Sequence, residues 1–196
     1  MLMKINIEIA TPDMASHIAS LIMEAMNPEC CQNLAGPGHT LVDFHRLMTK
    51  LVEMEDSQYS YRNTLVALTS SGILAGICVA YDGGQLRQLR RRFIEAAQEA
   101  FDIDYSTMPD ETEEGEYYVD SLAVSSNFRG KGIATELLKA VIAKAQEKGM
   151  PTVGLLVDKG NPKAEKLYAR VGFQYVNDSI WGGHSMKHLQ HRQTMI

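Results

Sequence analysis

One short stretch, residues 127–134, restricts the fold of this chain more than any other part. It reads Asn-Phe-Arg-Gly-Lys-Gly-Ile-Ala, follows a strand-like run from Glu116 to Val124 and opens a long helix-like run. Gly130 and Gly132 allow the backbone to turn tightly and to come close to a ligand. The first N–H groups of the helix have no partner within it, and the helix dipole places positive charge at the same point. Such a turn between a strand and a helix favours binding of a phosphate or pyrophosphate.

Length and charge narrow the class of protein. A chain of 196 residues with 45% hydrophobic content can bury one good core, so we expect a single domain over residues 1–196. The net charge of −5 argues against a nucleic-acid partner. Met1 to Ile9 alternates apolar and polar residues and lacks the apolar block of a signal peptide, and no run approaches the roughly 20 apolar residues that cross a bilayer. Three cysteines, two of them adjacent, do not make a disulfide framework, so we expect a cytoplasmic protein without a membrane partner.

Apolar periodicity and turn residues predict an α/β chain in which strands and helices are interspersed. Alternating or wholly apolar runs predict strands over residues 5–9, 63–69, 73–81, 116–124, 153–157, 173–176 and 185–189. Helical spacing of apolar residues predicts helices over residues 11–26, 41–54, 85–101, 133–148 and 161–170. Gly36-Pro37-Gly38 indicates that residues 32–40 form a loop.

Two sequence blocks carry a family resemblance. Arg129 to Ala134 matches the pattern Gln/Arg-x-x-Gly-x-Gly/Ala, whereas a P-loop would need Ser or Thr after Lys131 and a dinucleotide fingerprint would need glycine at position 135. A second pattern, Asn-x-x-Ala-x-x-Leu-Tyr and then Gly-Phe, is matched downstream by Asn161, Ala164, Leu167, Tyr168, Gly172 and Phe173. With both blocks in a strand–turn–helix context, the segment from Tyr117 to Phe173 resembles the GNAT (Gcn5-related N-acetyltransferase) superfamily.

The resemblance implies a fold and a donor. The fold is a mixed α/β sheet, flanked by helices, whose central parallel strands splay apart, and the acyl donor is acetyl-CoA. The turn implied to hold the CoA pyrophosphate consists of Arg129, Gly130, Lys131, Gly132, Ile133 and Ala134. The preceding strand end would pair with the pantetheine arm, and its amides would face the thioester oxygen; it consists of Leu122, Ala123 and Val124. Asn161, which caps the downstream helix, is a further candidate contact of the donor.

The resemblance also implies that Tyr168 acts as general acid on the leaving sulfur; from the residues alone, a core tyrosine with a satisfied hydroxyl would be favoured. An amine with a pKa near 10.4 is mostly protonated at pH 7, a handicap of roughly 4–5 kcal/mol, so a base helps to remove the proton. Some family members carry a catalytic glutamate where this chain has Tyr118. Asp120 is the better candidate base because it lies deeper in the strand. Glu116 is the second candidate, with a solvated carboxylate at the rim as an equal interpretation, and both share one strand face if no bulge intervenes.

We therefore expect transfer of an acetyl group from acetyl-CoA to a primary amine by direct attack, with a small cationic amine as acceptor. The alternatives are a longer acyl donor, a CoA-binding sensor or scaffold without turnover, and an N-terminal or protein acetyltransferase. The motifs leave the acceptor open, because function belongs to the site rather than to the fold.

The segment from Gly83 to Gly115 is an insertion relative to family members that join these strands by a short turn. Every charged residue from Asp102 to Glu116 is acidic. The insertion could cover the acceptor site and attract a cationic amine. We favour a second interpretation, in which the acidic loop is solvated and the helix packs on the sheet or on the second subunit of a homodimer. The reason is that runs of charged residues are usually solvated. The polar side of the helix is predicted to carry Arg87, Arg90, Arg91 and Arg92.

No metal site is expected. The histidines His184, His188 and His191 lack nearby acidic or cysteine ligands, and a strand would place the last two on opposite faces, so we interpret all three as surface residues. Cys78 lies in an apolar strand and is predicted to be a core residue, whereas Cys30 is predicted to lie in a loop.

Overall fold

The computed structural model describes residues 4–193; the first three residues of the alternating N-terminal run lie outside that range. The strands are β1 (Ile5–Ile9), β2 (Thr64–Thr69), β3 (Leu74–Asp82), β4 (Glu116–Val124), β5 (Thr152–Asp158), β6 (Gln174–Trp181) and β7 (His184–Arg192). The helices are α1 (Ala15–Met26), α2 (Pro28–Ala35), α3 (Leu41–Glu53), α4 (Leu86–Phe101), α5 (Ile133–Glu147) and α6 (Pro162–Val171). Short 3₁₀ turns are η1 (Pro12–Met14), η2 (Tyr61–Asn63), η3 (Gly83–Gln85) and η4 (Ser126–Phe128). Among the described residues, no helix has both the length and the apolar character needed to cross a bilayer.

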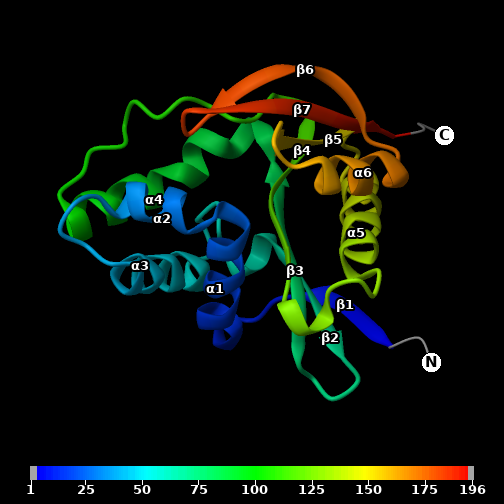
Figure 1. Cartoon of the computed structure of the whole chain (residues 1–196), viewed down its shortest axis with the longest axis horizontal. Helices are drawn as coiled ribbons and strands as arrows, with labels where there is room; N and C mark the ends of the chain where they lie inside the picture. Colours follow the sequence, from blue (N-terminus) through cyan, green and yellow to red (C-terminus); the bar gives the residue numbers. More distant parts are fainter. Residues whose placement is uncertain (1–3, 194–196) are drawn as a thin grey trace.

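The seven strands form one sheet in the order β1-β2-β3-β4-β5-β7-β6, with helices on both of its faces. Helices α1 to α4 lie on one side of the sheet and α5 and α6 on the other (Figure 1). Each side has its own core, one around Phe44 and Met48 of α3 and the other around Leu137 and Leu138 of α5, all fully buried. This α/β architecture confirms the predicted fold class.

The centre of the sheet opens where β4 and β5 stop pairing. These two strands are parallel, with a register that runs from Glu116 opposite Thr152 to Val119 opposite Leu155. Beyond that point β4 continues to Val124 and β5 continues to its end without further pairing to each other. The other neighbouring strands are antiparallel. The predicted mixed sheet with splayed central strands is therefore confirmed.

A β-bulge lies in β4 at Asp120. Val79 of β3 pairs with Ser121, but the next residue of β3 pairs with Val119, so Asp120 has no partner residue in β3. Side chains alternate strictly along a regular strand, and one extra residue exchanges the two faces beyond it. Val119 accordingly packs in the core beneath α5, whereas Ala123 packs in the core beneath α1 and α3. The condition that no bulge separates Glu116 from Asp120 is therefore not met.

The loop predicted over residues 32–40 is wrong for residues 32–35, because they belong to α2. The Asn27 side chain accepts a hydrogen bond from the N–H of Cys30 at 2.9 Å, and Pro28 occupies the first helical position. Asn-Pro therefore caps and starts a helix here, as it does before α6. Cys30 and Cys31 lie on this helix rather than in a loop.

The insertion (residues 83–115) consists of η3, α4 and the acidic segment that returns to β4. Arg90, predicted on the polar side of the helix, is instead 3% exposed. Its guanidinium donates to the carbonyls of Met108 and Pro109, at 3.1 and 3.0 Å, and is paired with Glu111. The acidic segment folds back over the helix, which explains why Arg90 is buried.

Candidate active site

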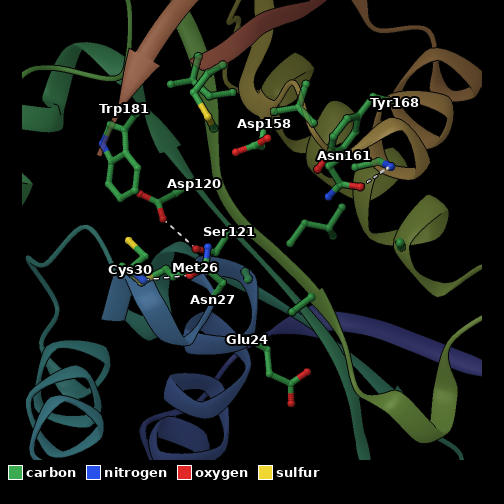
Figure 2. A pocket seen from close by; sticks show the side chains of 18 of the residues that line it. Glu24, Met26, Asn27, Cys30, Asp120, Ser121, Asp158, Asn161, Tyr168 and Trp181 are labelled. Carbon is green, nitrogen blue, oxygen red and sulfur yellow. Dashed lines mark hydrogen bonds between the residues drawn. The ribbon is translucent and has the colours of Figure 1, made fainter. Parts of the chain in front are cut away.

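A cavity of about 500 Å³ lies where β4 and β5 separate. Figure 2 shows Tyr168 and Asn161 on one side of it and Asp120 and Trp181 on the other. Of the predicted site residues, the cavity is lined by Asp120, Leu122, Ala123, Val124, Arg129, Ala134, Asn161 and Tyr168. One cavity thus brings together the candidate acid, the preferred candidate base and the end of the glycine turn.

The glycine turn has the backbone geometry that the sequence suggested. Gly130 and Gly132 have φ of 74° and 80°, in the left-handed region, and a Cβ on either would meet no atom within 4 Å. None of the backbone N–H groups from Gly130 to Ala134 donates a hydrogen bond within residues 4–193. The Ile133 side chain is buried in the core, so only its backbone is free to meet a ligand. These open donors fit the pyrophosphate of CoA.

The two basic side chains of the turn have different positions. The Arg129 guanidinium lines the cavity, donates to the carbonyl of Val124 at 2.9 Å and pairs with Glu24 of α1 at 3.1 Å. Lys131 is outside the cavity lining; its Nζ donates to the Asn127 carbonyl at 3.2 Å and lies 5.3 Å from the centre of the Phe128 ring. Arg129 is therefore the turn's cationic side chain at the cavity.

Tyr168 projects from α6 into the cavity lining. Its ring packs edge-on against Phe173, with the ring centres 5.9 Å apart, and its hydroxyl makes no hydrogen bond to any residue of the described chain. Burial raises the pKa of this phenol, so it stays protonated at neutral pH. Asn161 accepts a hydrogen bond from the N–H of Ala164 at 3.1 Å and so caps α6 while also lining the cavity.

Asp120 sits at the bulge and is held by three donors. Tyr81 and Ser121 donate through their hydroxyls, each at 2.9 Å, and Gln58 donates through its amide at 3.2 Å. Burial raises the pKa of the Asp120 carboxyl, although these hydrogen bonds oppose the rise. A carboxylate with a raised pKa and a fixed orientation has the properties of a general base.

The structure does not bring Glu116 to the cavity. It is 1% exposed, so the interpretation as a solvated rim carboxylate is wrong, and it is absent from the cavity lining. Its oxygens accept hydrogen bonds from Gln190 Nε2 at 3.2 Å and from the N–H of Glu113 at 3.0 Å, and lie 2.8 Å from His188 Nε2. Gly154 leaves the space that the carboxyl fills, because a Cβ there would collide with it. His188 is 3% exposed, which also corrects its interpretation as a surface residue.

Several cavity residues were not predicted from the sequence. Asp158, at the end of β5, and His184, at the start of β7, both line the cavity, with 3.6 Å between Asp158 Oδ2 and His184 Nδ1. The lining also includes Tyr59, Glu111, Tyr118 and Trp181. These residues come from segments far apart in the chain, so no local pattern could have grouped them. No group of three or more potential His, Cys, Asp or Glu ligands for a metal occurs among residues 4–193.

Comparisons with known proteins agree with this geometry. A model of the acetyltransferase (GNAT) family matches residues 48–173. An Arabidopsis thaliana protein named GCN5-related N-acetyltransferase 4, chloroplastic, is 42% identical over 59 residues, 30% of this chain and 20% of that protein. The Haemophilus ducreyi protein named [Ribosomal protein bS18]-alanine N-acetyltransferase is 41% identical over 56 residues, 29% of this chain and 39% of that protein. These matches thus span well under half the length of either relative.

Solved structures match nearly the whole chain. A crystal structure described only as an acetyltransferase superposes with a TM-score of 0.79 and 28% identity, covering 95% of this chain and 98% of the other. An N-acetyltransferase from Staphylococcus aureus superposes with a TM-score of 0.75 and 22% identity, covering 95% and 100% of the two chains, and supports the fold alone. Since the family model spans most of the chain and includes both sequence blocks, this chain belongs to the GNAT family of acetyltransferases.

Proposed function

We propose that this chain is an acetyl-CoA-dependent N-acetyltransferase whose acceptor is a primary amine that attacks the donor directly. The observation that carries the proposal is the single cavity that joins Arg129 and Ala134 to Tyr168 and Asp120. Direct attack needs donor, acid and base around one space, with both substrates bound together. A small cationic amine fits the carboxylates that line this space.

The donor half is assigned to the turn and the splayed strands. The open N–H groups from Gly130 to Ala134 would hold the pyrophosphate, with Arg129 adding charge. The unpaired edge of β4 beyond Val119 offers backbone groups to the pantetheine arm, although the carbonyl of Val124 already accepts from Arg129. Acetyl-CoA supplies an activated acetyl group as a thioester. Backbone amides of β4 would stabilise negative charge that develops on the carbonyl oxygen.

The proton transfers are assigned to two side chains. Asp120 accepts a proton from the acceptor's ammonium group, which frees the nitrogen lone pair to form the new C–N bond. As the C–S bond breaks, the Tyr168 hydroxyl donates its proton to the leaving sulfur, and the second proton lost by the nitrogen when the neutral amide forms restores the phenol. Asp120 therefore acts as base and Tyr168 as acid, one from each side of the cavity (Figure 2).

A peptide α-amine is the second candidate acceptor, because a Haemophilus ducreyi relative is named as an alanine N-acetyltransferase acting on a ribosomal protein. Release of CoA thiol on mixing the protein with acetyl-CoA and a panel of diamines, monoamines, amino acids and short peptides separates these possibilities. Acceptor-dependent release with small amines supports the proposal, and release with peptides alone would shift the assignment to a protein substrate. CoA binding without release by any acceptor would favour a sensor or scaffold.

A further inference from the structure

The half of the cavity away from the glycine turn carries excess negative charge. Four carboxylates line the cavity, from Glu24, Glu111, Asp120 and Asp158, whereas Arg129 is the only Lys or Arg in the lining. Arg129 is paired with Glu24 at the donor end. Glu111 and Asp120 therefore lie at the acceptor half without a lysine or arginine beside them in the lining.

Glu111 comes from the insertion and faces the cavity from a fixed position. Its side chain is 5% exposed, and that of its partner Arg90 is 4% exposed. Arg90 is absent from the cavity lining and is fastened to the backbone of the same segment through Met108 and Pro109. The guanidinium thus holds the carboxylate from behind, and a ligand would meet the carboxylate.

Two tyrosines beside Glu111 have hydroxyls that no protein group uses. Tyr59 and Tyr118 are 5% and 4% exposed, and both line the cavity. Neither hydroxyl makes a hydrogen bond within the described part of the chain. The two hydroxyl oxygens are not among the buried side-chain atoms that lack a partner, so both are accessible from the cavity that these side chains line. Side chains that are otherwise buried but keep a free hydroxyl at a cavity can donate to or accept from a ligand there. The Trp181 side chain also lines the cavity, and an indole ring attracts cations.

We propose that Glu111 binds a second ammonium group on the acceptor, so that the preferred acceptors are diamines rather than simple monoamines. The reacting amine then lies at Asp120, and the distal ammonium lies between Glu111 and the aromatic side chains. This inference rests on the proposed function, because it names the substrate class of the same site. If the Arg90–Glu111 ion pair only held the insertion in place, replacing Glu111 would not change the preference between diamines and monoamines.

Titration of Glu111 is consistent with this role. Burial raises the pKa of Glu111 to about 7, even though the charge of Arg90 lowers it, and the charge of Asp120 raises it further. An ammonium group placed here stabilises the ionised carboxylate. The titratable groups around it are Arg90, Asp120 and the phenols of Tyr59, Tyr81 and Tyr118. The three phenols remain neutral in this pH range because burial raises their pKa. Diamine preference should therefore grow as the pH rises through about 7.

The test compares butane-1,4-diamine with butan-1-amine in thiol-release kinetics. We expect kcat/KM to favour the diamine at least ~10-fold in the wild-type protein. In Glu111→Gln the ratio should fall to about the statistical factor of 2, with the KM for acetyl-CoA unchanged. Glu111→Asp keeps the charge and should retain part of the preference. Glu114→Gln is the matched control, because it removes one carboxylate from the same segment at an exposed position outside the cavity, and it should keep the wild-type ratio.

Calorimetric titration of both amines into the CoA-bound protein provides a readout that does not need turnover. Tighter binding of the diamine, lost in Glu111→Gln, supports the inference even if no amine is acetylated, an outcome that would refute only the proposed function. Equal binding and equal kcat/KM of the two amines would overturn the inference and leave the acetyltransferase proposal standing. A preference that persists in Glu111→Gln would also overturn it.

Discussion

At the scale of single residues, the ring of Tyr168 has a structural role and its hydroxyl has a chemical role. Its ring packs against Phe173, while its hydroxyl has no partner among residues 4–193 and lines the cavity. The two parts can be separated experimentally, because a phenylalanine keeps the packing and removes only the hydroxyl.

We expect Tyr168→Phe to lower kcat roughly 100-fold with little change in acetyl-CoA affinity, because the leaving sulfur loses its proton donor. Steady-state thiol release and a titration with CoA measure the two quantities. Tyr175→Phe, an exposed tyrosine on β6, is the control and should behave like the wild-type protein. An unchanged kcat in Tyr168→Phe would remove the assigned role.

Asp120 gives a prediction in pH. Because burial raises its pKa, the rise of kcat/KM with pH should lie above the ordinary range of an aspartate, near 3.9. Asp120→Asn keeps the side-chain shape but cannot take a proton, so kcat/KM should fall roughly 100-fold and this limb of the profile should disappear. The measurement is the pH–rate profile of both proteins. A limb that stays in place in the variant would assign the base to another group.

At the scale of elements, Glu116 and His188 join β4 to β7 across β5. Burial alone would lower the pKa of His188, but the hydrogen bond and charge of Glu116, together with the nearby Glu113, raise it overall. A histidine whose pKa is raised on folding contributes stability that is fully present below its unfolded pKa, near 6.5. That stability is lost as the pH rises through the folded pKa.

His188→Gln should therefore lower the free energy of unfolding by about 1–3 kcal/mol below pH 6.5, because it leaves the buried Glu116 without its charged partner. The deficit relative to the wild-type protein should shrink as the pH rises above 6.5. Urea unfolding at several pH values measures it, with the exposed His17→Gln as control. A deficit independent of pH would mean that packing, rather than the charged pair, is what the substitution removes.

The sequence predicted what depends on local chemistry and missed what depends on tertiary contact. The turn at Gly130 and Gly132, the strand before it and the cap at Asn161 follow from neighbouring residues, so they were predictable. Arg90 and Glu116 are buried only because distant segments fold over them, and charged residues are otherwise expected at the surface. Glu111 reaches the cavity for the same reason.

At the scale of the whole molecule, the cavity lies between the parts of the fold that carry the two cores. Its lining includes residues of α1 and β4 as well as α6 and β7. A ligand that fills it would contact both sides of the sheet, and binding to the folded state alone raises apparent stability by mass action.

CoA at about 100 times its dissociation constant should therefore stabilise the protein by about 2.7 kcal/mol, measured as a shift in Tm. Gly132→Ala forces a left-handed conformation on alanine, at a cost of roughly 1–2 kcal/mol, and adds a methyl group at the turn, so it should lower Tm and weaken the CoA shift. Gly72→Ala, at the β2–β3 hairpin with φ 79°, carries the same strain away from the cavity and should keep the full CoA shift. If CoA raised the Tm of both variants equally, the turn at Gly132 would not take part in CoA binding.

The bulge at Asp120 affects how this strand can be compared with any other. Because one residue of β4 has no partner in β3, the alternation of side chains shifts by one position at Asp120. Each residue after Asp120 therefore faces the side of the sheet opposite to the one that alternation from the start of the strand would give. Counting back from Val124 to find an equivalent of Tyr118 or Glu116 crosses this shift and can assign the wrong face. When β4 is aligned with the equivalent strand of a relative, residues before Asp120 should therefore be counted from the start of the strand and residues after it from the end of the strand.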